Sequence, residues 1–167
     1  MPGVSGGMTA VRRRVLVRPD VIRFLDAEAG SCAGRPEAGG TLLGSRRGPD
    51  LEILGWTVPG PGDDRRPHAF TRADPRHQAA ATAAWNASGG TVAFVGEWHT
   101  HPAGGVAPSA VDLRTWKRLT KANGRPMAFA LVAPGEWGVF LARPGLPRPV
   151  VRRSRPIEHS GLGVVFA

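Results

Sequence analysis

The stretch 96–112 holds the residues whose types and spacing best suit chemistry. His99 and His101 stand two residues apart, directly after an apolar, β-prone run. Side chains two residues apart on a strand lie on the same face, so both imidazoles should approach one point. Ser109 should begin a helix, with Asp112 in its first turn. Two histidine nitrogens and one carboxylate oxygen make a three-ligand zinc site that leaves a fourth position for water, as catalytic zinc does.

Each of these residues also has a purely structural interpretation. His99 and His101 could be polar residues on the exposed face of a strand. Ser109 and Asp112 resemble a capping box, and the helix dipole favours an acidic residue in a first turn. The two interpretations of Asp112 are compatible, because the cap would fix the helix that carries the ligand.

The motif extends beyond the three ligands. His-Thr-His-Pro at 99–102, six further residues, and Ser-x-x-Asp at 109–112 resemble the JAMM motif of the MPN+ (JAB domain) zinc metalloprotease family. The family also has a glutamate well upstream, at the start of a strand. The segment Glu-Ala-Gly-Gly-Thr-Leu-Leu-Gly at 37–44 is similar to that part of the family. The resemblance is closest to bacterial stand-alone JAB deconjugases, such as those of antiphage operons.

The resemblance assigns a role to each motif residue. Zn²⁺ lowers the pKa of a bound water from about 15.7 to roughly 7 and polarises the scissile carbonyl. A general base must still take the proton of the water, and the family match for that role is Glu37. Ser109 is implied to donate a hydrogen bond to the oxyanion. The implied metal ligands are His99, His101 and Asp112.

Glu97 is an alternative to Glu37 and a departure from many family members, which carry an aromatic residue at this position. It lies two residues before His99, so a regular strand places it on the ligand face. It could serve as the base, as a fourth ligand, or as a partner that holds an imidazole in place. Glu37 is the preferred base.

The activity implied by the resemblance is zinc-dependent isopeptidase or peptidase cleavage after the C-terminal tail of a ubiquitin-like modifier. The reaction would remove a modifier from its conjugate or process its precursor. The expected partner is therefore a ubiquitin-like modifier or its protein conjugate. One alternative is a hydrolase that processes sulfur-carrier proteins, and another is a non-catalytic MPN-type interaction module. Such modules typically lose the histidines or the aspartate, and this chain keeps all three.

The composition sets the class of protein. With 167 residues and 41% hydrophobic residues, the chain suits one soluble globular domain. A single cysteine excludes an intrachain disulfide, and no stretch is long and apolar enough for a membrane span, which together favour a cytoplasmic location. The net charge of +9 is attributed to arginines scattered over the chain, so no nucleic-acid partner is expected. Residues 1–10 should be flexible, and 11–167 should form the JAB/MPN+ domain.

The expected fold class is α/β, a single JAMM-type domain with a mixed, curved sheet flanked by helices. Apolar runs, helix caps and turn residues predict the elements. Expected strands are 15–17, 41–43, 51–58, 69–71 and the motif strand, followed by a hairpin of 127–132 with 137–142. Residues 150–151 and 164–166 could form short strands, or the C-terminal end could be loosely ordered. Expected helices run from Pro19 to about Gly30, from Asp74 to about Ser88 with Trp85 as the large anchor, and from Ser109 to Asn123. Residues 59–67 are expected to form a loop.

The remaining reactive and aromatic side chains receive structural interpretations. Cys32 is taken as a small residue near a helix end. The surface is the expected place for His68, His77 and His159, and packing is the expected role of Trp98 and Trp116.

Overall fold

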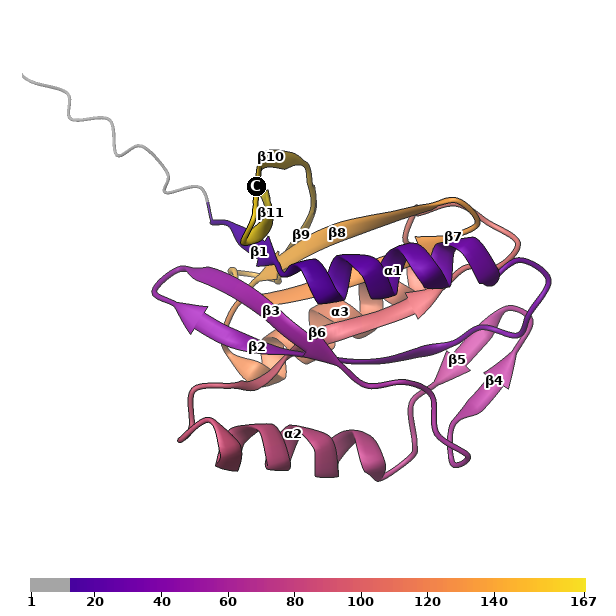
Figure 1. The fold of residues 1–167 in the computed structure, drawn as a ribbon, viewed down its shortest axis with the longest axis horizontal. Helices are drawn as coiled ribbons and strands as arrows, with labels where there is room; N and C mark the ends of the chain where they lie inside the picture. The colour runs from indigo at the N-terminus through magenta and orange to yellow at the C-terminus, as the bar shows by residue number, and fades with distance from the viewer. Residues whose placement is uncertain (1–12) are drawn as a thin grey trace, which may run out of the picture.

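The structure is a computed structural model that describes residues 13–167, so the flexibility expected for 1–10 lies outside it. Figure 1 shows the order of its elements. They are β1 (Val15–Val17), α1 (Pro19–Ser31), β2 (Gly39–Arg47), β3 (Asp50–Trp56), β4 (Asp64–Arg66), β5 (Ala69–Thr71), α2 (Arg76–Ala87), β6 (Ala93–Thr100), α3 (Ala110–Asn123), β7 (Met127–Ala133), β8 (Glu136–Arg143), β9 (Val150–Ser154), β10 (Pro156–Ser160) and β11 (Gly163–Phe166).

Nine of these strands form one mixed sheet in the order β10-β11-β1-β3-β2-β6-β7-β8-β9. β1 pairs in parallel with β3, and β6 in parallel with β7, whereas the other neighbours are antiparallel. The expected mixed α/β fold is therefore confirmed. The antiparallel pairing of β2 with β6 sets Gly39 opposite His99, so the upstream glutamate segment begins beside the motif.

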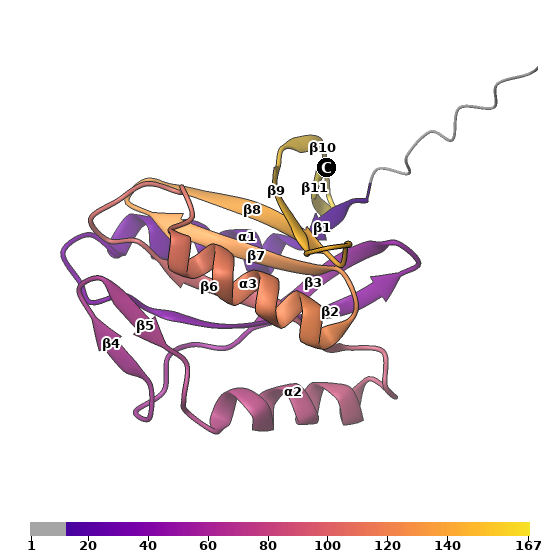
Figure 2. The same ribbon diagram turned by 180° about the vertical axis from the view of Figure 1, so that it is seen from behind.

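Both faces of the sheet are covered near its centre. Alternate residues of β7 enter two different hydrophobic clusters, one reached by α1 and the other by α3. Ala130 belongs to the first cluster and Phe129 to the second. A strand buried on both faces reads as a continuous apolar run, which explains the composition of 127–133. Figures 1 and 2 show α1 and α3 on opposite sides of the sheet, with α2 apart from both.

Glycines allow the strands around the motif to approach closely. A Cβ at Gly96 of β6 would lie 1.5 Å from the carbonyl oxygen of Ala128 in β7. A Cβ at Gly40 of β2 would lie 2.0 Å from the carbonyl oxygen of Thr57. Any side chain at these positions would push apart the strands that hold the motif.

Three expectations about the segment between β3 and β6 are wrong. Part of the expected loop 59–67 forms β4, which pairs with β5 in a hairpin. The expected anchor of α2, Trp85, is 51% exposed, although the expected cap Asp74 does lie at the start of the helix, where its carboxylate accepts the backbone N–H of Arg76 at 2.9 Å. His77, expected on the surface, is only 1% exposed.

A polar network explains why His77 is buried. Its Nε2 donates to Asp63 at 2.8 Å, and its Nδ1 accepts from the hydroxyl of Thr57. Asp63 also accepts the backbone N–H groups of Gly60, Ala73 and Asp74. Although burial opposes its charge, these donors hold the pKa of Asp63 well below its usual range.

The C-terminal third is ordered into strands. The hairpin of β7 and β8 agrees with the sequence, and β9 and β11 contain the apolar pairs expected as strands. Cys32 is buried at the end of α1, where burial raises the pKa of its thiol, as suits a structural residue. Within residues 13–167, no helix combines the length and the apolar character needed to cross a membrane.

Candidate metal centre

The two motif histidines converge as their spacing predicts. His99 lies near the end of β6, and His101 follows directly after the strand. Their Nε2 atoms are 3.1 Å apart, and their side chains are 13% and 15% exposed. The backbone N–H of His101 donates to the carbonyl oxygen of Val132 in β7 at 2.7 Å, so the sheet also fixes the residue beyond the strand end.

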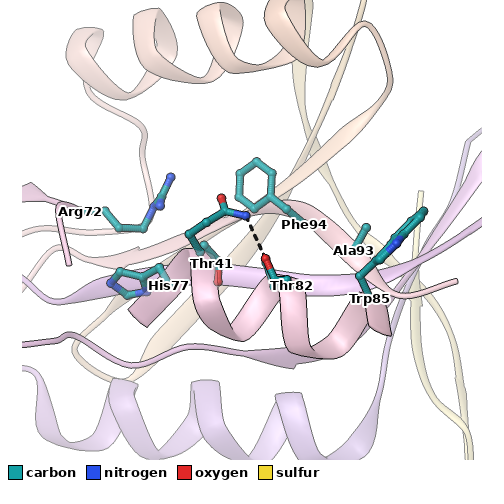
Figure 3. Close-up of a pocket in the computed structure, with 9 residues that line it drawn as sticks. Thr41, Arg72, His77, Thr82, Trp85, Ala93 and Phe94 are labelled. Atoms are coloured by element: carbon teal, nitrogen blue, oxygen red, sulfur yellow. Dashed lines mark hydrogen bonds between the residues drawn. The ribbon is translucent and has the colours of Figure 1, made fainter. Parts of the chain in front are cut away.

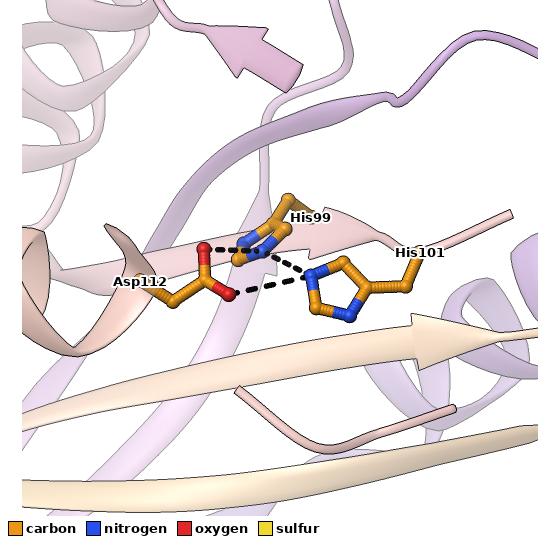
Figure 4. Close-up of side chains that lie close together, drawn as sticks. All are labelled: His99, His101 and Asp112. Atoms are coloured by element: carbon orange, nitrogen blue, oxygen red, sulfur yellow. Dashed lines mark hydrogen bonds and ion pairs between the residues drawn. The ribbon is translucent and has the colours of Figure 1, made fainter. Parts of the chain in front are cut away.

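Asp112 approaches the histidines from the start of α3. Ser109 is the N-cap of this helix, and it forms a reciprocal capping box with Asp112. One carboxylate oxygen of Asp112 lies 3.1 Å from Nε2 of His99, and the other lies 3.4 Å from Nε2 of His101 (Figure 4). One carboxylate therefore caps α3 and also contacts both histidines.

The electrostatics of the group favour a charged aspartate. Burial alone would raise the pKa of Asp112, but hydrogen bonds from His101 and His99 hold it well below its usual range. The hydrogen bond to Asp112 in turn raises the pKa of His101. Such mutual shifts are typical of tightly grouped residues at functional sites.

The donor set fits a zinc ion. Single donor atoms of His99, His101 and Asp112 all lie within 4.8 Å of one another. Nδ1 of His101 donates to the carbonyl oxygen of Gly105 at 3.2 Å, so loss of the proton from Nε2 would leave that nitrogen free to bind a metal. Two nitrogens bound to one tetrahedral zinc at 2.0–2.1 Å would be about 3.3 Å apart. The observed separation of 3.1 Å is close to that value.

Glu37 lies beside this group, held mainly through its backbone. Its N–H donates to the carbonyl oxygen of Arg66 in β4 at 2.8 Å, and its carbonyl oxygen accepts from the guanidinium of Arg65 at 2.9 Å. The next residue, Ala38, donates its N–H to the hydroxyl of Thr100 at 2.9 Å. Burial raises the pKa of Glu37, and the nearby His99 and His101 partly oppose that shift.

A groove of about 770 Å³ runs past the group. One wall is formed by the start of α3, with Val111, Thr115 and Arg118, and the other by residues 67–72 of the β4–β5 hairpin and its exit. The groove thus brings together every expected site residue, namely Glu37, Glu97, His99, His101, Ser109 and Asp112. His68 lines the same groove, whereas His159 is exposed on β10.

Glu97 points into the groove but is held by another side chain. Its carboxylate accepts from Nε of Arg72 at 2.9 Å, and a second guanidinium nitrogen lies 2.8 Å away. The guanidinium carbon of Arg72 also lies 5.7 Å from the centre of the Phe94 ring. Within residues 13–167, Glu97 thus pairs with Arg72 rather than with an imidazole.

Arg72 was missed by sequence reasoning, and it reaches two cavities. A smaller pocket of about 320 Å³ lies between α2 and β6 and is lined by Arg72, His77, Trp85 and Phe94 (Figure 3). Arg65 and Thr100 were missed in the same way, because their partners lie 28 and 62 residues away in the chain. No local signal in the sequence identifies such contacts.

Two tryptophans flank the motif in the sequence and serve packing, as expected. Trp98 and Trp116 are each 1% exposed. Trp116 stacks on Phe129 at a centroid distance of 4.7 Å and lies 6.2 Å from the ring of His99. It therefore supports the histidine from inside the core.

The fold and the motif together define a JAMM-type domain, and comparison with known proteins agrees. Residues 27–143 match the model of a family described as prokaryotic homologs of the JAB domain. The chain belongs to this family.

Curated relatives carry a more specific name. A protein of Pseudomonas aeruginosa called CD-NTase/cGAS isopeptidase is 43% identical over 98 residues, which cover 58% of this chain and 62% of the relative. A Vibrio cholerae protein of the same name is 41% identical over 83 residues, covering 50% and 53%. The matches therefore span less than two thirds of these relatives.

A solved structure supports the fold alone. The solution structure of a protein from Desulfitobacterium hafniense superimposes with a TM-score of 0.58 and 24% sequence identity. The superposition covers 83% of this chain and 89% of that protein.

Proposed function

We propose that this protein is a zinc-dependent isopeptidase that releases a ubiquitin-like modifier from a protein conjugate. The observation that carries the proposal is the convergence of His99, His101 and Asp112 in a groove that also contains Glu37. The names of the relatives support a conjugated protein of the CD-NTase/cGAS class.

The zinc site would use His99, His101 and Asp112. When bound, zinc supplies a Lewis acid that polarises the scissile carbonyl and makes water a stronger acid. His101 is prepared for this role by its hydrogen bond to Gly105, which fixes the tautomer that offers Nε2.

Glu37 is proposed to move the proton. Its carboxylate takes a proton from the attacking water while the oxygen of that water bonds to the carbonyl carbon. When the C–N bond breaks, Glu37 delivers the proton to the leaving amine of the lysine side chain. Burial and the fixed backbone of Glu37 keep this carboxylate in place beside the metal ligands.

Ser109 is proposed to stabilise the oxyanion that forms at the carbonyl oxygen. Its Oγ accepts the backbone N–H of Asp112 at 3.1 Å, so its own O–H remains available to donate. A hydrogen-bond donor that is already positioned for the developing negative charge lowers the energy of the transition state and contributes much of the rate increase in acyl transfer.

The substrate tail is proposed to lie extended in the groove between α3 and the β4–β5 hairpin. The groove is lined by His99, His101 and Asp112. An extended tail that ends in small residues can bring its carbonyl to a crowded metal, and strand-like backbone pairing would hold it in register.

The test compares two substrates that share one tail. The first is a folded modifier whose Gly-Gly tail is joined to a protein lysine, and the second is a short peptide with the same tail and isopeptide bond. The folded conjugate should be cut with the higher kcat/KM, and replacing the last Gly by a bulky residue should prevent cleavage. Equal rates on both substrates would contradict recognition of a folded modifier, and cleavage of neither would contradict the proposed activity.

A further inference from the structure

The net positive charge of the chain comes from one segment. Residues 113–155 contain ten lysines and arginines and one glutamate, a net charge of +9. The rest of the chain contains twelve residues of each sign and is neutral. The arginines are scattered along the chain, as expected from the sequence. The acidic residues are not, because residues 113–155 contain only one of them.

The ten cations of this segment also lack acidic partners. Within residues 13–167, none of them takes part in an ion pair. Seven arginines elsewhere do, namely Arg14, Arg18, Arg23, Arg47, Arg66, Arg72 and Arg76. The charge of residues 113–155 is therefore not used to stabilise the described fold through ion pairs.

Helical spacing gathers much of this charge into one stripe. At about 100° per residue, the four cations of α3 fall within roughly 100° of its circumference, opposite Trp116 and Thr120, which are buried. Arg153 of β9 joins them, because it pairs with Phe140, a member of the cluster that α3 covers. We call this surface the basic face, and it comprises Arg114, Lys117, Arg118, Lys121 and Arg153.

The basic face begins at the rim of the groove. Arg118 belongs to both, since it lines the groove together with Val111 and Thr115 of the same helix. Val111 is 59% exposed. Figure 2 shows α3 lying across β7, so that the outer side of this helix faces away from the sheet. A folded protein whose tail lies in the groove would meet this side of α3 next.

We propose that the basic face docks an acidic surface of the folded protein conjugate. This inference rests on the proposed function, because it takes the occupant to be the folded modifier whose tail lies in the groove. Unpaired cations beside the groove would steer an acidic partner toward it and raise the rate of association.

A protein suits this surface better than a single-stranded nucleic acid does. Single-stranded nucleic acids are bound by cationic grooves interleaved with aromatic side chains, on which the bases stack. Within residues 13–167, the exposed large hydrophobic side chains near the basic face are aliphatic, such as Val111, whereas the exposed Trp85 projects from α2. A charged rim beside an exposed aliphatic residue resembles a protein interface.

Charge reversal away from the groove tests the inference. Arg114→Glu/Lys121→Glu changes two exposed cations of the basic face and spares Arg118. The matched control, Arg152→Glu/Arg155→Glu, changes two exposed cations by the same net charge. Arg152 pairs with Leu141, on the opposite side of the sheet from α3, and Arg155 follows the end of β9.

The readout is kcat/KM for the folded conjugate and for the peptide with the same isopeptide bond. At low salt, Arg114→Glu/Lys121→Glu should lower kcat/KM for the conjugate by about 10-fold or more and leave the peptide unchanged. Arg114→Gln/Lys121→Gln should give a smaller loss, and the control pair should have little effect. The defect should shrink as salt rises.

Binding separates this inference from the proposed function. The Glu37→Gln protein is titrated with the conjugate and with duplex DNA, with and without the charge reversal. Weaker conjugate binding on charge reversal supports the inference even if the wild-type protein fails to cleave, which would overturn only the proposed function. The inference is overturned if conjugate binding and cleavage are unchanged, if peptide cleavage falls equally, or if charge reversal weakens only the binding of DNA.

Discussion

At the scale of single residues, two glutamates compete for one chemical role, and their neighbours distinguish them. Glu97 is paired with a guanidinium, whereas the carboxylate of Glu37 is half-buried beside the candidate metal ligands. An ion pair stabilises the deprotonated form of a carboxylate and makes it a weaker base. The contacts therefore favour Glu37 as the base.

Replacing each glutamate by glutamine tests this assignment. Glu37→Gln should retain zinc and the fold while lowering kcat by about 10²–10⁴-fold, because it removes the general base. Glu97→Gln should cost much less, since it removes only the partner of Arg72. Single-turnover cleavage and metal content should be measured on both variants. An inactive Glu97→Gln protein beside an active Glu37→Gln protein would reverse the assignment.

Thr100 should act as a positioning residue. Its hydroxyl accepts the buried N–H of Ala38, next to Glu37, so it ties the base to the strand that carries His99. Thr100→Val keeps the shape but leaves that N–H unpaired, at a cost of about 1–3 kcal/mol. A base displaced in this way can slow catalysis by about 10²-fold.

The readout for Thr100 is a split between kinetic constants. Thr100→Val should lower kcat with KM and zinc content unchanged, and Thr100→Ser should restore kcat because it keeps the hydroxyl. Equal activity of Thr100→Val and the wild-type protein would show that this hydrogen bond does not position the base.

At the scale of elements, the segment between β3 and β6 is organised by polar contacts instead of apolar packing. Asp63 gathers three backbone N–H groups and His77, and so joins the loop after β3 to the start of α2. The β4–β5 hairpin is joined to the backbone of Glu37. One wall of the groove therefore depends on hydrogen bonds that water and acid can disturb.

Asp63 should make stability depend on pH. Its pKa is lowered in the folded protein, so its contribution is complete above the unfolded pKa of about 3.9 and is lost as pH falls toward the lower folded value. Asp63→Asn should lower the free energy of unfolding at pH 7 by roughly 1–3 kcal/mol. Urea unfolding should show this difference shrinking below about pH 4. A difference that is constant from pH 7 to pH 3 would mean that the ionised carboxylate is not what stabilises the segment.

At the scale of the whole molecule, the candidate metal centre joins the two sides of the sheet. His99 and His101 come from β6 and the residue after it, and Trp98 of β6 belongs to the cluster reached by α1. Asp112 comes from α3, which packs on the other cluster through Trp116. A ligand that binds all three residues should therefore stabilise the complete fold.

Zinc should raise the thermal stability of the protein. Zinc at about 100 times its Kd contributes about 2.7 kcal/mol. For a chain of this size that corresponds to an increase in Tm of roughly 5–10 °C, which chelation should reverse. Asp112→Ala should abolish the response to zinc without preventing folding. An equal increase in Tm for Asp112→Ala and the wild-type protein would place the metal elsewhere.

Much of the fold and of the candidate site could be predicted from the sequence, because the signals are local. The strand spacing of His99 and His101, the cap at Ser109 and the apolar run 127–133 each depend on residues close together in the chain. The two-residue period of a strand and the cap of a helix both depend on residues close together in the chain. These signals therefore predicted the strand and the helix that carry the candidate ligands. The expectation that Trp85 anchors α2 was wrong, because the hydrogen bond between His77 and Asp63, and not this apolar side chain, holds the start of the helix.

Only the tertiary structure decided which distant groups meet. The pairing of Glu97 with Arg72, the burial of His77 against Asp63, and the hydrogen bonds of Ala38 to Thr100 and of Arg65 to Glu37 all join residues at least 14 positions apart. The basic face likewise required α3 to fold beside β9, because total charge does not show where unpaired cations gather. Such contacts depend on how strands register and helices pack, and those long-range choices leave no periodic trace in the sequence.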